Sequence, residues 1–406
     1  MILSVLVIVL VAVIAYFHYV EGFFSATISA ILAAISAAIA LSYQEPLTRL
    51  LQGKFPDNAN ALAIIAIFAV TYTILRLIFD KAIPGNIRLP VIMDKVGAGI
   101  AGIFAGIFAV GILVIAAQML PFGPSIAGYS RYKLTDVREA QIPTGRQAID
   151  THVYNELFSS TFVPEDKTSL ILPVDDIVVN LTSHLSDGGS LAGPVDFAQV
   201  HPSYLDELFG QRLGVQTGAR HVAINLDHEK DVDLRGIYTV DSLPQAESEI
   251  PSIRKTDAEH LKPVKSDPSE IILIVRITLT KNAADSDSNV RISTGGVRLV
   301  ANQKNYMPLG TLDSTGSPLL RMDHPDDFLI VPADGTVDFI FLVPRSEFGL
   351  DANPKDKNPK LAIGPNVFME VKRAATIDLD GHDVTVGEPP ATKPGVLRKQ
   401  DLNKRT

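Results

Sequence analysis

The stretch VGAGIAGIFAGIFAVGILVIAAQ, residues 96–118, contains no charged side chain and is rich in glycine and alanine. A helix of about 20 residues is about 30 Å long, which matches the hydrocarbon core of a bilayer. The stretch therefore predicts a membrane-spanning helix. Its beginning, GAGIAG at residues 97–102, also matches the G-x-G-x-x-G fingerprint of dinucleotide-binding turns.

A dinucleotide site needs a strand before the glycines and an acidic residue about 20 positions after them, which binds the ribose. The first acidic residue after Asp94 is Asp136, which is too distant and lies beyond the span. A nucleotide phosphate would also have to lie at or inside the bilayer. We therefore interpret the glycines as helix-packing residues and expect no cofactor.

Small residues recur along one face of this predicted helix. Ala98, Gly102 and Gly106 are spaced by four residues, so they share a face. Such a face lets two helix backbones approach closely in a membrane. The second apolar stretch has a similar face, formed by Ser29, Ala33, Ser36, Ala37 and Ala40. We expect spans two and four to pack together or to form a homo-oligomer contact; a generic helix without a special partner is the alternative.

Three further stretches, residues 2–20, 22–44 and 59–75, are uncharged or carry no charge near their middle. Because a charge at mid-span costs about 2.5–3.5 kcal/mol, they predict three more membrane helices, with the lipid bilayer as partner. His18 and Arg76 lie at span ends, where their side chains are expected to reach the interface. The lack of a charge within the spans argues against an ion-coupled transporter.

Charge and composition restrict the compartment and the partners. The loop between the third and fourth spans carries Lys81 and Arg88 and is flanked by Arg76 and Lys95, whereas the loop between the second and third, on the other side, carries Arg49 and Lys54. This bias favours a cytoplasmic location for the loop between the third and fourth spans. It therefore predicts that the C-terminal region is extracytoplasmic. The net charge is −9 without a basic block, so we expect no nucleic acid partner. The absence of cysteine excludes disulfides and thiol nucleophiles.

Two short motifs flank the spans. A Gly-Phe pair, Gly22-Phe23, opens the second span, and an Asp-basic pair at Asp94 precedes the glycine face. Together with four spans, these motifs resemble the colicin V production protein (CvpA) family of bacterial inner-membrane proteins, over about residues 1–122. The chain departs from the family pattern at Glu21, where a basic residue is usual, and at Ala98, where glycine is usual.

The resemblance implies a bacterial inner-membrane protein linked to toxin export or production, or to envelope homeostasis. It also marks the residues that we predict to mediate helix packing: Gly22, Asp94, Ala98, Gly102 and Gly106. Some relatives carry an extracytoplasmic serine protease domain, so a membrane-tethered hydrolase is one alternative function. A small transporter or channel component is another.

The soluble region contains only fragments of hydrolase motifs. Ser190 lies in DGGSLAG, and Ser252 is followed three residues later by Lys255, but neither has a G-x-S-x-G context. We interpret the first as a glycine-rich loop and the second as part of a proline-rich linker. We therefore predict no catalytic residue and no enzyme activity.

Two acidic segments suggest metals only weakly. Residues 285–289 begin like a calcium-binding loop, but Val290 replaces the required glycine and Gly296 the required glutamate. Residues 221–233 gather two histidines with several carboxylates, without the spacing of a zinc motif. We interpret these segments as a hairpin loop and a solvated acidic loop, and predict no metal site.

The predicted fold is an α-helical membrane domain followed by a soluble α+β segment and an all-β immunoglobulin-like sandwich. Strand-like runs such as IILIVRITLT, residues 271–280, support the sandwich. The predicted segments are a membrane domain at 1–122, a linker at 123–145, an α+β segment at 146–240, a proline- and charge-rich linker at 241–268, the sandwich at 269–380 and a disordered tail at 381–406. The predicted function is a non-enzymatic envelope scaffold that binds an unknown envelope protein.

Overall fold

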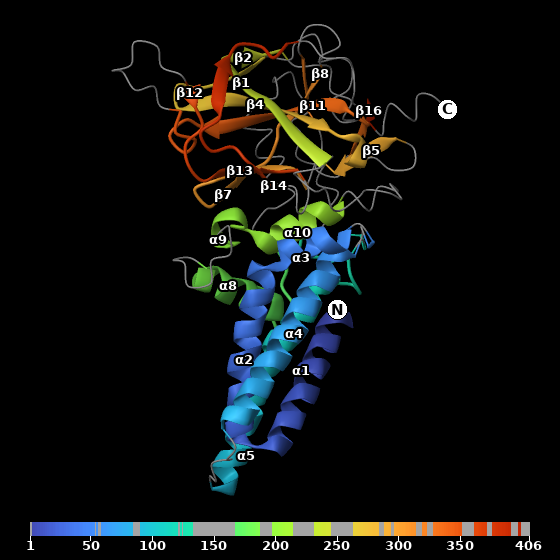
Figure 1. Cartoon of the computed structure of the whole chain (residues 1–406), viewed down its shortest axis with the longest axis vertical. Coiled ribbons are helices and arrows are strands. Elements are labelled where there is room, and N and C mark those ends of the chain that lie inside the picture. Colours follow the sequence, from blue (N-terminus) through green and yellow to red (C-terminus); the bar gives the residue numbers. More distant parts are fainter. Residues whose placement is uncertain are drawn as a thin grey trace, which may run out of the picture. The chain divides into compact units, whose positions relative to one another are not determined.

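The computed structural model describes most of the chain in two compact units (Figure 1). The described residues are 2–52, 54–55, 58–83, 90–120, 122–123, 125–132, 167–186, 197–213, 231–244, 263–283, 288–293, 296–313, 319–322, 328–350, 361–371, 376–390 and 397–398. The membrane unit comprises the described residues of 1–131 and 168–209, and the β unit those of 132–167 and 210–406.

Four long apolar helices form most of the membrane unit. They are α1 (Ile2–Glu21), α2 (Phe23–Ser42), α4 (Ala59–Ala82) and α5 (Val91–Met119). Each is long and apolar enough to cross a membrane, which confirms the four predicted spans. A short helix, α3 (Gln44–Gln52), connects α2 to α4 and carries an ion pair between Glu45 and Arg49.

Helix α5 is the central element of this unit, because it contacts α1, α2 and α4. Figure 1 shows the four long helices side by side. Buried alanines of α2 pack against buried small residues of α5 in two apolar clusters. Small side chains therefore let three helices approach α5 closely.

A segment that follows the spans also belongs to the membrane unit. Helix α8 (Val174–Ser186) packs against α5 and α2, and α9 (Phe197–Val200) and α10 (Tyr204–Leu213) follow it. These residues were predicted to belong to a separate soluble segment, 146–240. The difference arises because Val178 and Tyr204 join the same apolar cluster as Ile115 of α5. Helix α10 begins directly after Ser203.

The β unit is built on a seven-stranded sheet in the order β12-β15-β1-β4-β11-β8-β9. Its strands are β1 (Val232–Val240), β4 (Glu270–Leu279), β8 (Gly310–Asp313), β9 (Leu319–Met322), β11 (Gly335–Pro344), β12 (Leu361–Ala362) and β15 (Asp383–Val386). Strand β4 pairs antiparallel with β1 and β11 and is buried over nearly its whole length. Its run of β-branched residues suits a strand that is covered on both faces.

Three smaller sheets complete the described part of the β unit. One has the order β16-β10-β5, another β14-β13-β6-β7, and the third pairs β2 with β3. Their strands are β2 (Ser242–Leu243), β3 (Val264–Lys265), β5 (Asn289–Ser293), β6 (Arg298–Ala301), β7 (Lys304–Tyr306), β10 (Phe328–Pro332), β13 (Val367–Glu370), β14 (Thr376–Asp378) and β16 (Leu397–Arg398). A 3-10 turn, η5 (Lys281–Ala283), follows β4.

The topology differs in detail from an immunoglobulin-like sandwich, which is not confirmed. The region after the spans is a mixed helical and sheet region with several small sheets. Strand β1 comes from the predicted α+β segment, and β15 from the predicted disordered tail. They pair in parallel, with Ile237 opposite Val384. Both side chains are buried in the main core, which explains why these short segments are ordered there.

Candidate functional site in the membrane unit

The glycine face of α5, defined here as Gly102 and Gly106, contacts α1. A Cβ atom on Gly102 would lie 2.8 Å from the Cβ of His18 and 2.9 Å from the Cα of Ala15. A Cβ on Gly106 would lie 3.2 Å from the Cα of Val11. The two helix backbones therefore touch without intervening side chains. The predicted packing of spans two and four is confirmed by the contacts between α2 and α5, but the two glycines themselves face the first span.

The alanine face of α5, defined as Ala98 and Ala101, contacts α2 instead. Both residues form a buried cluster with Ala26, against which Phe23 packs. The neighbouring Gly97 makes room for that ring, because a Cβ there would lie 2.5 Å from the Cδ2 of Phe23. One helix thus uses two small-residue faces for two partners. Ala98 replaces the usual family glycine at a position that contacts α2.

The turn between α1 and α2 consists of Gly22. Its φ of 107° is unfavourable for any other residue, and a Cβ would lie 3.2 Å from Oδ1 of Asp94. That carboxylate accepts a hydrogen bond of 2.9 Å from the backbone N–H of Phe23. Asp94 of α5 therefore caps the N-terminus of α2 from outside, where negative charge is favourable.

Lys95 binds the C-terminal end of α1, on the other side of the same turn. Its Nζ donates to the carbonyl oxygens of Tyr19, at 3.0 Å, and Val20, at 3.3 Å, in the last turn of α1. The ammonium also lies 5.2 Å from the centre of the Tyr19 ring. A cation is favourable at a helix C-terminus. We call the arrangement of Gly22, Phe23, Asp94 and Lys95 the hairpin clamp. In it, the dipeptide Asp94-Lys95 bonds the N-terminus of α2 and the C-terminus of α1.

Arg76 lies at the same end of the membrane unit, on α4. Its guanidinium donates to the hydroxyl of Ser29 at 2.7 Å and to that of Ser25 at 2.8 Å, both on α2. It also pairs with Asp80 at 3.2 Å. The side chain was predicted to extend toward the interface, but it bonds the neighbouring helix. Two serines four residues apart were the sequence signal for this contact.

The polar contacts continue from α2 to α1. The hydroxyl of Ser25 donates to Oε2 of Glu21 at 3.1 Å, and Nδ1 of His18 lies 3.3 Å from the same oxygen. The charged groups at this end therefore bond other parts of the same chain. Glu21 replaces the usual basic residue of the family pattern, and here its carboxylate accepts from Ser25, which also binds Arg76.

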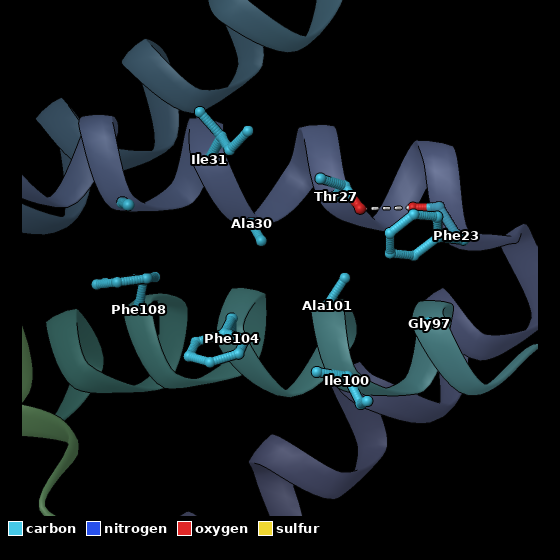
Figure 2. A pocket seen from close by; sticks show the side chains of 10 residues that line it. Phe23, Thr27, Ala30, Ile31, Gly97, Ile100, Ala101, Phe104 and Phe108 are labelled. Atoms are coloured by element: carbon cyan, nitrogen blue, oxygen red, sulfur yellow. Dashed lines mark hydrogen bonds between the residues drawn. The ribbon is translucent and has the colours of Figure 1, made fainter. Parts of the chain in front are cut away.

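An apolar groove lies beside the hairpin clamp, between α2 and α5 (Figure 2). Its volume is about 410 Å³, and its lining residues are Phe23, Thr27, Ala30, Ile31, Ala34, Gly97, Ile100, Ala101, Phe104 and Phe108. Figure 2 shows Ala30 and Ala101 facing each other from the two helices. The hydroxyl of Thr27 donates to the carbonyl oxygen of Phe23 at 2.9 Å. The lining suits a lipid acyl chain or an apolar helix.

We expect Asp94→Ala to destabilise the membrane unit by about 1 kcal/mol, since it removes the acceptor that caps α2. Asp94→Asn keeps an acceptor oxygen and should cost less. Unfolding of the full chain in mixed detergent micelles, followed by circular dichroism, measures the change. Asp80→Ala is the matched control, because Asp80 is 56% exposed and pairs within its own helix. Equal losses for Asp94→Ala and Asp80→Ala would contradict the capping role.

Several sequence candidates lie outside the described residues. These are Ser190, Ser252, Lys255, the acidic pair Asp285 and Asp287, and residues 221–229. Where the calcium-like segment is described, Asn289 begins strand β5 and Val290 is buried in the core. Asp233, at the end of the acidic segment, is exposed and pairs with Arg235 at 3.0 Å.

These features define a polytopic membrane protein with a tightly packed bundle of four apolar helices and an internally bonded helical hairpin. Residues 3–132 match the model of the family described as colicin V production protein. The match includes the hairpin clamp and both small faces of α5, and it ends before α8. This confirms the resemblance over the N-terminal segment. No curated protein and no solved structure matches the chain.

Proposed function

We propose that this membrane protein is a non-enzymatic scaffold of the bacterial envelope, in which the spans anchor an interaction module. The observation that carries the proposal is the hairpin clamp with the two small faces of α5. Asp94 and Lys95 bond the ends of α1 and α2, and the glycine face holds α1 against α5. Such bonding suits a rigid anchor. The family match links that anchor to colicin V production.

The β unit is the proposed interaction module. Strands at the edges of a sheet present backbone donors and acceptors to which an extended segment of a partner can pair. In the seven-stranded sheet the outer strands are β12 and β9. We propose an envelope protein as the partner, since the N-terminal segment resembles an inner-membrane family.

Crosslinking in intact cells tests the interaction. A photoreactive residue at Ala362 of β12, an outer strand of the seven-stranded sheet, is expected to give a discrete protein adduct. The same group at exposed Leu50 of the membrane unit serves as the control and should not give that adduct. A fluorophosphonate label lost in Ser190→Ala or Ser252→Ala would favour the hydrolase alternative instead, and solute flux in proteoliposomes would favour a transporter.

We further propose that the β unit lies outside the cytoplasm, which the basic residues of the 3–4 loop support. The chain has no cysteine, so single cysteines report orientation without background. In intact spheroplasts, a membrane-impermeant thiol reagent should label Asp233→Cys. It should label Lys81→Cys only after lysis. The reverse pattern would place the β unit in the cytoplasm.

A further inference from the structure

Helix α8 begins at the depth of the membrane spans. Val11 lies at the middle of α1 and faces Gly106 of α5, so this contact marks the middle of the bundle. Gly111 lies five residues further, or about 7–8 Å along the helix. The first turn of α8 contacts this glycine: a Cβ there would lie 2.7 Å from the carbonyl oxygen of Val174 and 2.5 Å from Val178. Half of a hydrocarbon core is about 15 Å thick, so this contact lies within it.

The chain just before α8 confirms this depth. Leu172 lines an apolar groove between α1 and α5 together with Val11 and Ala15. Val174 is fully buried in a cluster that includes Val7 and Val11. The segment from Leu172 to the first turn of α8 therefore lies beside α1 and α5 at this depth. A carboxylate at the start of α8 is brought to a depth that the four spans themselves leave free of acidic groups.

That carboxylate is Asp175, which is completely buried. Nε2 of Gln118, on α5, donates to its Oδ2 at 2.8 Å. The other oxygen, Oδ1, has no hydrogen-bond partner among the described residues, and neither has Oε1 of Gln118. Two buried oxygen atoms of adjoining side chains thus lack a donor. Buried polar atoms without partners are rare because they lose their hydration without compensation.

The nearby cation, Arg131, forms its ion pairs with carboxylates other than Asp175. The guanidinium of Arg131 bonds Asp206 through Nε and Asp176 at 3.2 Å. Three carboxylates therefore lie around one cation, and the two partly exposed ones bind it. Burial is the main reason that the pKa of Tyr129 is raised to about 12, so this phenol is neutral.

Opposing effects act on the carboxyl group itself. Burial raises the pKa of Asp175, and the charge of Asp176 raises it further. The hydrogen bond from Gln118, a hydrogen bond from the backbone of Asp176 and the attraction of Arg131 lower it, and the N-terminus of α8 also favours an anion. Burial is the largest of these effects, so the pKa of Asp175 lies above its ordinary value.

We propose that Asp175 and Gln118 form a proton-binding site at the level of the spans, occupied at neutral pH. A proton on Asp175 supplies the missing donor: the acid and the amide then exchange two hydrogen bonds. This goes beyond a scaffold, because buried acids at membrane depth are the groups through which proton-coupled membrane proteins bind and release protons. Release of the proton would leave an anion beside Asp176 and weaken the contact between α8 and α5.

Infrared difference spectroscopy on the full chain in lipid nanodiscs, with carbon-13-labelled aspartate, tests the site. The wild type is expected to show the carbonyl band of a protonated carboxyl group at neutral pH, absent from Asp175→Asn and shifted in Gln118→Leu. Asp80→Asn, at an aspartate of α4 that is 56% exposed, is the matched control and should retain the band. A wild-type spectrum without a protonated carboxyl band at neutral pH would overturn the proposal, whether or not the variants fold.

Stability gives a second readout with a defined sign. When the folded pKa of an acid lies above its ordinary value of about 3.9, the folded state binds more protons between the two values. Melting temperature should therefore fall as pH rises through this window and level off above the raised pKa. Asp175→Asn should show a flatter profile than the wild type, and the exposed-site control Asp80→Asn should not. Identical slopes in wild type and Asp175→Asn would contradict the site.

Discussion

Gly102→Leu is expected to force α1 away from α5 and to lower the free energy of unfolding of the membrane unit by about 3 kcal/mol or more. Even a single Cβ at this position would lie 2.9 Å from the Cα of Ala15. Backbone at that distance does not move aside as a flexible side chain does. The α1–α5 contact runs along both spans, so its loss removes much of the packing that holds the bundle together.

Gly99 supplies the matched control for this change. It lies on the same helix three residues earlier, and a Cβ there would have only the Tyr19 ring within reach, at 3.9 Å. Gly99→Leu should therefore change stability little, whereas Gly102→Ala should already be destabilising. Equilibrium unfolding in mixed detergent micelles compares the variants. Similar losses for leucine at both positions would show that bulk in the helix, rather than the contact with α1, is responsible.

Asp338→Ala is expected to destabilise the β unit by about 3–5 kcal/mol, because it leaves a buried guanidinium without its counter-charge. Nε and Nη2 of Arg276 donate to the two carboxylate oxygens at 2.6 and 2.7 Å. The two residues lie opposite each other on β4 and β11, and their side chains are 6% and 2% exposed. The remaining Nη1 donates to the carbonyl oxygen of Pro390 at 2.8 Å, which holds Arg276 in place.

An exposed ion pair in the same unit is the control for this prediction. Lys281 and Asp334 lie 3.5 Å apart with side chains 81% and 55% exposed, so Lys281→Ala should cost less than about 1 kcal/mol. The paired change Arg276→Met with Asp338→Leu removes both charges and should recover most of the loss. Thermal unfolding of the full chain gives both values. A double variant as unstable as Asp338→Ala would mean that the ion pair itself contributes net stability.

Much of the membrane unit was predictable because its signals are local. An uncharged run of 20 residues must be helical to cross a bilayer, so composition alone located four spans. The positions of Gly22 and Asp94 were found through the family resemblance, since nothing in their spacing along the chain indicates that they meet. Gly102 and Gly106 revealed a close helix contact. Spacing on one helix does not identify the partner, and the structure assigns α1.

The remaining features depend on contacts between distant segments. Asp175 lies in a mixed polar and apolar stretch, and only the packing of Val174 and Val178 on Gly111 brings it beside Gln118. Strand β15 is too short for its alternation to stand out, and it is ordered by parallel pairing with β1. The Arg276–Asp338 pair lies in two strands whose other residues are mostly apolar. Pairing register, which sequence periodicity does not specify, places those charges together.

The hairpin clamp also bears on how the protein is made. The backbone N–H of Phe23 and the carboxylate that caps it are 71 residues apart in the chain. At 5–20 residues per second, the ribosome needs roughly 4–14 s to extend the chain from one to the other. During that interval the first two spans are in the membrane with an uncapped turn. The last span therefore completes the α1–α2 hairpin only after it has been synthesised. A chain truncated before Asp94 would leave the turn uncapped and the hairpin accessible to chaperones, quality-control proteases or non-native helix contacts.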